Sequence, residues 1–291
     1  NLFGTARRLD IQWQREEQQS QEVGIQYSEP WIFDLPLNIS AGFVQRQQDS
    51  IYIRRTVEAK AVLTVVDDLS ASGNVSREDV IPSSSISQGV VSASQTVYTG
   101  LELRFDTRDD LLSPTSGLNY RTGYQIGTKK SVDNIVGSPS VSRSTLLQRV
   151  SLDAELYASL FVRQILLLGI HGRQITGGNI EIGDRYRFGG TNSLRGYREN
   201  QFLGSRIAWT NAEYRFLLAR RSFFYFFIDN GYYYMPPDVT GSIPSSQSFK
   251  YGYGIGIRLE TLLGNIGVSF ALGEGDSFSQ AKVHVGLIND F

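Results

Sequence analysis

Hydrophobic and polar positions alternate along almost the whole chain with a period of two. Near the start, Leu9, Ile11 and Trp13 are apolar, while the residues between them are charged or polar. This period places successive side chains on opposite faces, which is typical of a β-strand with one apolar and one polar face. The pattern predicts about fourteen strands, centred on residues 9–13, 23–27, 37–43, 57–65, 69–78, 97–105, 118–126, 150–156, 165–171, 207–216, 223–234, 249–259, 265–272 and 282–291.

The connections between these strands alternate in length. Short connections are expected at residues 30–36, 66–69, 106–117, 160–164, 217–222 and 261–264. Longer ones, rich in Ser, Gly, Asn and Pro, are expected at residues 80–94, 127–147, 173–203 and 235–248. Short periplasmic turns and long outer loops are the usual asymmetry of an outer-membrane barrel. By this parity we expect both chain ends on the periplasmic side.

The charged face of the strands distinguishes a membrane barrel from a soluble one. A soluble β-sandwich or lipocalin-like barrel also alternates, but its apolar face points inward to a core. In this chain the polar face carries many charges, which fit a water-filled lumen, and the apolar face then fits lipid. These charges are Asp10, Glu22, Glu58, Lys60, Glu102, Arg104, Arg121, Asp153, Glu155, Glu213, Arg215 and Asp229. We therefore expect an all-β fold, a transmembrane antiparallel β-barrel over residues 1–291, in the cell outer membrane.

Composition removes several other classes of protein. The 28 Lys and Arg residues nearly balance the 29 Asp and Glu residues, so the chain lacks the basic surface that nucleic-acid binding requires. No run approaches the ~18 apolar residues of a membrane-spanning helix. There is no cysteine, the only histidines are His171 and His284, and no phosphate-binding glycine loop is present. We therefore expect no metal and no cofactor.

The long connection at residues 173–203 carries the most informative stretch of the sequence. Loops of this length without secondary structure are usually functional or disordered. Gly189, Gly190 and Gly196 permit backbone conformations that other residues resist, so the loop can fold back on itself, with Arg195 as its candidate anchor. On the next two strands the period of two places Glu213 and Asp229 on the polar face. The alternative is that Arg195 is a solvated loop charge and the two acids only keep the lumen wet.

Two short motifs carry a specific resemblance. Residues 188–190 (Phe-Gly-Gly) and 194–197 (Leu-Arg-Gly-Tyr) resemble the inward-folded sixth-loop motif of the BamA/TamA outer-membrane assembly superfamily. The resemblance implies that the loop arginine, Arg195, reaches acidic positions on the two following strands, which correspond to Glu213 and Asp229. Gly196 and Tyr197 complete the motif. Such a guanidinium–carboxylate cluster is a structural lock rather than a catalytic site.

Other segments extend the resemblance along the chain. Asp106, Arg108 and Asp109 are similar to the family's Asp-x-Arg-Asp periplasmic turn. The last strand is similar to the family's carboxy-terminal signal, with Val283, Val285, Gly286, Leu287 and the terminal Phe291. Residues 1–5 resemble the turn between the second and third strands of a sixteen-stranded barrel. The chain would then supply strands three to sixteen, without the first hairpin and the periplasmic domains; a self-contained fourteen-stranded barrel is the alternative.

The resemblance implies a function at the outer membrane. A family member of this type is an assembly factor that inserts unfolded outer-membrane client proteins into the lipid bilayer without nucleotide hydrolysis. It acts through a lateral seam between the first and last strands and with periplasmic or lipoprotein accessory subunits. Two alternatives stay open at this point: a polypeptide-secretion translocator, and a passive pore or membrane anchor of a larger fusion protein. An enzyme using carboxylates such as Asp153 and Glu155 is a third, and we expect none.

Overall fold

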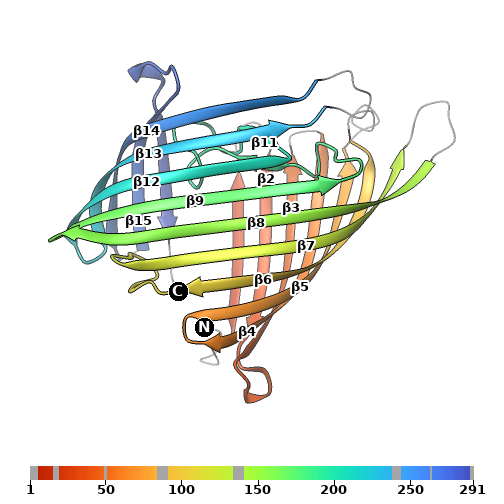
Figure 1. Ribbon diagram of the computed structural model, residues 1–291, viewed down its shortest axis with the longest axis horizontal. Coiled ribbons are helices and arrows are strands. Elements are labelled where there is room, and N and C mark those ends of the chain that lie inside the picture. The colour runs from red at the N-terminus through yellow and green to blue at the C-terminus, as the bar shows by residue number, and fades with distance from the viewer. Residues whose placement is uncertain are drawn as a thin grey trace. The chain divides into compact units, whose positions relative to one another are not determined.

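A single antiparallel sheet of fourteen strands dominates the molecule. The computed structural model describes residues 6–15, 20–48, 51–83, 91–133, 141–237, 244–262 and 264–288. Each strand of the sheet lies beside its neighbours in chain order (Figure 1). The strands are β1 (Arg8–Arg15), β2 (Gln21–Glu29), β3 (Leu37–Gln48), β4 (Tyr52–Val66), β5 (Leu69–Pro82), β6 (Ala93–Asp106), β7 (Gly117–Asp133), β8 (Val141–Phe161), β9 (Gln164–Gly177), β12 (Arg206–Ala219), β13 (Ser222–Met235), β14 (Ser246–Thr261), β15 (Gly264–Gly273) and β16 (Lys282–Ile288). The predicted all-β antiparallel fold is confirmed.

Smaller elements lie in the connections. Strands β10 (Tyr186–Phe188) and β11 (Phe202–Gly204) pair with each other inside the long connection between β9 and β12. In the part of the chain that the structure describes, the single-turn 3-10 helices η1 (Ile32–Asp34) and η3 (Phe278–Gln280) lie in connections of the main sheet. Among the described residues, no helix is long and apolar enough to cross a membrane.

The chain divides into two compact units. The first comprises Asn1–Leu103, Gly123–Val150 and Ile175–Arg185, and the second comprises Arg104–Thr122, Ser151–Gln174 and Tyr186–Phe291. The long connection therefore contributes its first part to the first unit and its second part, from Tyr186 onward, to the second unit.

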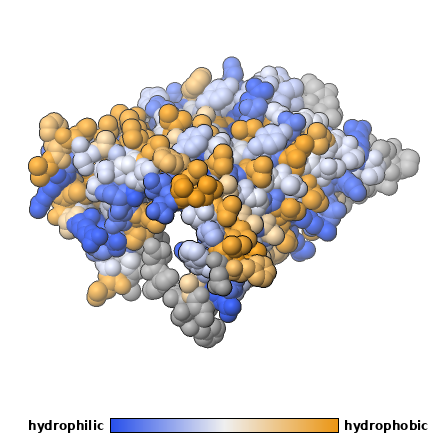
Figure 2. All heavy atoms as spheres, turned by 60° about the horizontal axis from the view of Figure 1, so that its bottom comes forward, coloured by the Kyte–Doolittle hydropathy of each residue, from blue (hydrophilic) through white to orange (hydrophobic). Residues whose placement is uncertain are grey.

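The two faces of the strands differ as the alternating pattern predicts. On β13, Ile228 is 57% exposed, whereas the adjacent Asp229 is fully buried. On β16, Val283 and Val285 are exposed while His284 between them is buried. Hydrophobic side chains also gather over broad areas of the surface in the space-filling view (Figure 2). On these two strands the exposed positions are apolar and the buried neighbours, Asp229 and His284, are polar, which is the arrangement expected of strands with a lipid-facing surface.

Several strands are longer than the sequence predicts. Residues 127–147 were expected to form a long outer loop, but β7 continues to Asp133 and β8 begins at Val141. Residues 173–177, expected in the inward-folded loop, belong to β9, so that loop begins at Gly178. A transmembrane strand needs only about 9–11 residues. Beyond that length a strand continues by backbone pairing whatever the polarity of its side chains, so hydrophobic alternation does not reveal its end.

Candidate functional site

The second half of the long connection packs on the buried face of β12 and β13. A cluster of apolar side chains, the loop cluster, consists of Phe188, Leu194, Tyr197, Phe202 and Ile207, with Tyr186, Trp209 and Tyr233 packed against it. The Phe188 ring lies 6.3 Å from that of Trp209 on β12 and 6.2 Å from that of Tyr233 on β13, between ring centroids. Aromatic contacts of this kind stabilise a docked loop beyond the area they bury.

Arg195, next to Leu194 of the loop cluster, forms a buried group of charges with Glu213 and Asp229. Its Nη1 donates to Glu213 Oε1 at 2.6 Å, and its Nε and Nη2 each donate to a different oxygen of Asp229 at 2.7 Å. The backbone N–H of Arg195 also donates to Asp229 Oδ2 at 3.1 Å. The guanidinium carbon lies 3.7 Å from the centroid of the Phe227 ring. Arg195 is 6% exposed and Asp229 is 0% exposed, so this is a nearly dry, bidentate ion pair.

Neighbouring side chains donate further hydrogen bonds to Glu213 and Asp229. Arg215 donates from Nε to Glu213 Oε2 at 2.8 Å, two residues along β12. Asn211 lies directly opposite Asp229 in the β12–β13 pairing and donates from Nδ2 to Asp229 Oδ1 at 2.8 Å. The same amide donates to the carbonyl of Ser193 in the loop at 2.9 Å. Every charge in the group is paired, and removing one partner from a buried pair typically costs about 3–5 kcal/mol.

The backbone of the loop comes into direct contact with β14 and β15. Gly189, Gly190 and Gly196 all adopt positive φ angles, 118°, 91° and 93°. A Cβ on Gly196 would lie 2.6 Å from the carbonyl of Leu272 on β15, and one on Gly252 of β14 would lie 1.9 Å from the carbonyl oxygen of Arg195. Tyr197 adds a donated hydrogen bond from its hydroxyl to the carbonyl of Tyr251 at 3.0 Å. The part of the loop around residues 191–197, the loop tip, therefore fits only because glycine stands at these positions.

His284 connects the loop tip to the last strand. The Gly196 N–H donates to His284 Nε2 at 3.2 Å, and Thr191 Oγ1 lies 3.2 Å from His284 Nδ1. Sequence reasoning did not include His284 or Asn211 in the site. The available signal was that His284, like Asn211 and Glu213, falls on the polar face of its strand.

The first half of the long connection has a separate anchor within the first unit. Lys129 of β7 is 1% exposed, and its Nζ lies 2.6 Å from Asp184 Oδ2 and 3.5 Å from Glu181 Oε2. Arg54 of β4 donates to the carbonyl of Gly183. Sequence reasoning missed this anchor because residue 129 was assigned to a loop rather than to the continuation of β7.

The predicted periplasmic turn is closely hydrogen-bonded. Arg108 donates from Nε and Nη2 to the two oxygens of Asp106, each at 2.8 Å. Asp109 accepts hydrogen bonds from the backbone N–H groups of Thr115 at 2.8 Å and Ser116 at 3.1 Å. Burial favours the neutral form of Asp109, but hydrogen bonds from the Thr115 side chain and from these backbone groups outweigh it and lower its pKa.

The predicted residues of the last strand are only partly described. Val283 and Val285 lie on the exposed face of β16, and Gly286 is half-buried on the opposite face. Leu287 belongs to β16 and pairs with Ile266 of β15. Phe291 and the predicted turn at residues 1–5 lie outside the described residues.

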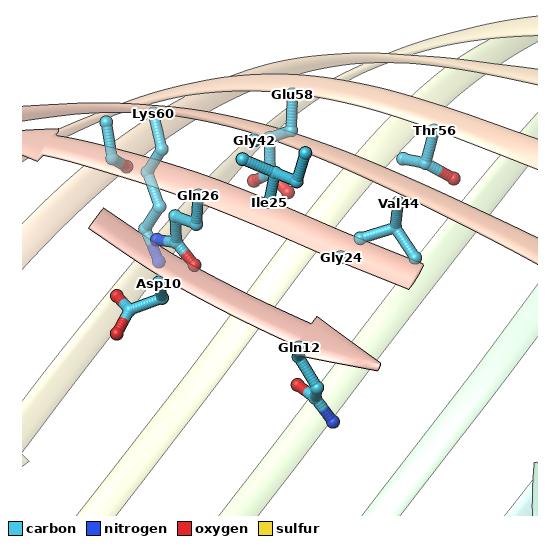
Figure 3. A pocket seen from close by; sticks show the side chains of 11 residues that line it. Asp10, Gln12, Gly24, Ile25, Gln26, Gly42, Val44, Thr56, Glu58 and Lys60 are labelled. Carbon is cyan, nitrogen blue, oxygen red and sulfur yellow. The ribbon is translucent and has the colours of Figure 1, made fainter. Parts of the chain in front are cut away.

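Polar side chains also line a hollow on β1 to β4 in the first unit. Asp10, Gln12, Gln26, Glu58 and Lys60 are among the residues that surround it (Figure 3). Lys60 pairs with Glu102 of β6 at 2.8 Å. Within the described ranges no group of three or more His, Cys, Asp or Glu side chains is placed to hold a metal ion. The hollow is lined by polar and apolar side chains together, since Ile25 and Val44 also border it.

The carboxylates considered for acid–base chemistry are held by neighbouring donors. Asp153 Oδ1 lies 2.8 Å from His171 Nδ1, and Arg173 Nη2 donates to both oxygens of Asp153 at 2.8 Å. Glu155 accepts from Asn119 at 3.2 Å and from the Tyr157 hydroxyl at 3.1 Å. These contacts belong to networks that connect neighbouring strands across the polar face.

Comparisons with known proteins bear on the fold and the family of the chain. No curated protein matches the chain. Among solved structures, BamA from Haemophilus ducreyi lacking POTRA domains 1–3 superposes with a TM-score of 0.63 at 13% identity, and covers 97% of this chain and 63% of its own. CdiB from Acinetobacter baumannii has a TM-score of 0.52 at 12% identity, and covers 91% of this chain and 55% of its own. The chain thus spans less than two thirds of each. The model of the Omp85 superfamily domain matches residues 1–287, and the chain therefore belongs to this superfamily of outer-membrane β-barrels.

Proposed function

We propose that this chain is the barrel of a factor that inserts polypeptides into the outer membrane, with a loop locked inside it by Arg195. The observation that carries the proposal is the buried cluster of Arg195, Glu213 and Asp229. Its members come from the loop, β12 and β13, and none of them is poised to attack a substrate. Membership of the Omp85 superfamily supports a role in membrane protein assembly or secretion.

The last strand supplies one side of a lateral seam in this proposal. β16 is seven residues long, and its outward side chains, such as Val283 and Val285, are apolar. A strand that loses its neighbour exposes a row of N–H and C=O groups, and an incoming strand of a client protein can pair with them. The hydrogen bonds and burial gained by the client then drive insertion. No nucleotide and no cofactor is required.

The locked loop keeps the neighbouring strands fixed while the seam opens. Its tip is bonded to β12 and β13 through Arg195 and lies against the backbone of β14 and β15 at Gly252 and Gly273. A buried ion pair is costly to break, so these four strands stay together when a client strand competes for β16. The partners proposed are the lipid bilayer, unfolded outer-membrane client proteins and periplasmic or lipoprotein accessory subunits.

The test is client insertion by proteoliposomes that contain the protein or its Arg195→Ala variant. Arg195→Ala leaves Asp229 and Glu213 buried with fewer partners, and we expect the rate of client folding to fall about tenfold or more, because tenfold corresponds to only about 1.4 kcal/mol. Arg198→Ala is the matched control, because Arg198 is exposed on the same loop. We expect this variant to insert clients at the rate of the unmodified protein.

The same variants distinguish insertion from a passive pore. Releasing the loop from the interior should raise single-channel conductance in a planar bilayer. If Arg195→Ala raises conductance but leaves client insertion unchanged, the protein is a pore with a plug rather than an insertion factor. If neither quantity changes, Arg195 does not lock the loop.

A further inference from the structure

His284 is bonded to the loop tip through both nitrogens of its ring. It lies on β16 with its side chain buried, whereas its neighbours Val283 and Val285 are exposed. On one side of the ring, Nε2 accepts from the Gly196 N–H at 3.2 Å, and on the other, Nδ1 lies 3.2 Å from Thr191 Oγ1. The last strand is thus fastened to the residue directly after Arg195.

The hydrogen-bond network assigns the protonation state of this ring. A threonine hydroxyl has one proton to donate, and Thr191 Oγ1 donates it to Glu199 Oε1 at 2.7 Å. The contact between Thr191 Oγ1 and His284 Nδ1 therefore requires the hydrogen to be on Nδ1. Nε2 then carries a lone pair, as it must to accept from the Gly196 N–H. The ring is neutral, with a defined tautomer.

Protonation would break this arrangement at one point. A hydrogen on Nε2 would face the Gly196 N–H, so two donors would oppose each other and the bond between β16 and the loop would be lost. The contact at Nδ1 would remain. The link between the last strand and the loop tip therefore depends on an unprotonated Nε2.

The charged groups around the ring come from the loop, β13 and β16. Glu199 Oε1 lies 4.0 Å from Nδ1, and Arg195, Asp229 and Lys282 act on the ring from farther away. Arg195 and Asp229 are paired with each other, and Lys282 is paired with Asp276 at 2.6 Å. Glu199 is therefore the acid that would stabilise a protonated ring after the bond to Gly196 is lost.

We propose that His284 is a positioning residue that fastens β16 to the loop tip and releases it when the ring is protonated. The proposal deepens the proposed function, on which it rests, because β16 is one side of the seam. Arg195 holds the tip to β12 and β13 through a guanidinium that does not titrate between about pH 5 and about pH 8. A proton therefore loosens the seam strand while the rest of the lock stays closed.

Spin-label distances test this without a client protein. The chain has no cysteine, so Asn192→Cys in the loop and Val285→Cys on β16 can be labelled specifically. Both positions are exposed. Double electron–electron resonance is recorded at about pH 8 and about pH 5, on either side of the ordinary histidine pKa of about 6.5. A second pair, Asn192→Cys with Ile228→Cys on β13, reports whether the loop itself has moved.

Two variants of His284 separate titration from packing. His284→Gln keeps a hydrogen-bond acceptor at a reach similar to Nε2 and does not titrate, and His284→Leu keeps bulk without an acceptor. His171→Gln is the control for the only other histidine of the chain. Client insertion is measured separately, so a failure of the proposed function does not change the distance result.

The expected result is a narrow distribution between loop and β16 at pH 8 and a second, longer population at pH 5. His284→Gln should stay narrow at both pH values, and His284→Leu should show the longer population at both. The loop-to-β13 distance should not change. The proposal is overturned if the loop-to-β16 distance is the same at both pH values, if His284→Leu matches the unmodified protein, or if His171→Gln abolishes the pH dependence.

Discussion

Arg195 anchors the second half of the long connection to β12 and β13. A guanidinium buried without partners would be very unfavourable, so the loop adopts the conformation in which both acids can reach it. Asp229 accepts three hydrogen bonds from Arg195 alone. This specificity comes from the planar donor fork of arginine, which lysine does not provide. The residue is therefore best understood as a structural determinant of the loop.

Close packing at Gly252 gives a prediction that does not involve charge. In Gly252→Ala the new Cβ would lie 1.9 Å from the carbonyl oxygen of Arg195, so the loop tip must shift. We expect a destabilisation of about 1–3 kcal/mol, the usual effect of overpacking, seen as a lower denaturant midpoint of unfolding.

Gly286→Ala is the matched control for this substitution. Among the described residues, no heavy atom beyond Gly286 and its two chain neighbours lies within 4 Å of a Cβ built on it, although this glycine also belongs to a strand of the same unit. We expect its free energy of unfolding to change by no more than about 0.5 kcal/mol, the usual effect of a surface substitution, so its denaturant midpoint should stay close to that of the unmodified protein. Equal effects of the two substitutions would show that the loop tip does not lie against β14.

The sequence predicted part of this site and missed part of it. Glu213 and Asp229 were found because alternation places them on the polar face and the loop motif implies acidic partners. Asn211 and His284 lie on the same face, but which of the inward residues meets the loop depends on how deep the tip reaches. That depth is set by Gly196, Gly252 and Gly273, which lie far apart in the chain. It is a property of the folded molecule.

Among the secondary-structure elements, strands were easier to predict than their ends. Alternation located all fourteen strands of the main sheet because lipid and water impose opposite requirements on their two faces. It did not predict β10 and β11, whose three residues each are too few to show a period. The ends that alternation predicted for β7 and β9 also come too early in the chain, because backbone pairing continues where lipid contact has ceased.

The turn between β6 and β7 gives a prediction of pH dependence. The folded state lowers the pKa of Asp109, so the charged form contributes stability above the ordinary aspartate pKa of about 3.9, and this contribution is lost as the pH falls through the lowered value. The N–H groups of Thr115 and Ser116, which donate to this carboxylate, should exchange with solvent faster in strong acid.

Hydrogen exchange at these two amides, corrected for intrinsic rates, measures the effect. Their protection should be constant at higher pH and should fall in acid. Asp109→Asn removes the titrating group. In this variant the protection of the Thr115 and Ser116 amides should not change with pH. Protection that falls equally in the variant would assign the acid sensitivity to another group.

On the scale of the whole molecule, the chain belongs to the Omp85 superfamily, and its long connection is divided between the two compact units. Each half of that connection has its own anchor: Lys129 with Asp184 in the first unit, and Arg195 with Asp229 in the second. Family and fold were predictable from short motifs and alternation, whereas the first anchor required the full course of β7.

In the proposed function, a client strand pairs with β16 at the seam and does not pair with a strand inside the sheet such as β13. Val285 on β16 and Ile228 on β13 are both outward-facing and similarly exposed, at 68% and 57%. If both positions only contacted lipid, a cysteine at either one should meet a client equally often. Only edge pairing with a client strand would bring a client backbone beside Val285.

Disulfide trapping during assembly tests this central claim directly. The protein with Val285→Cys, or with Ile228→Cys, is supplied with a client that carries a single cysteine in its terminal strand. We expect a mixed disulfide with the client at position 285, formed only while the client is inserting, and none at position 228. Equal trapping at both positions, or none at 285 during productive insertion, would contradict a seam at β16.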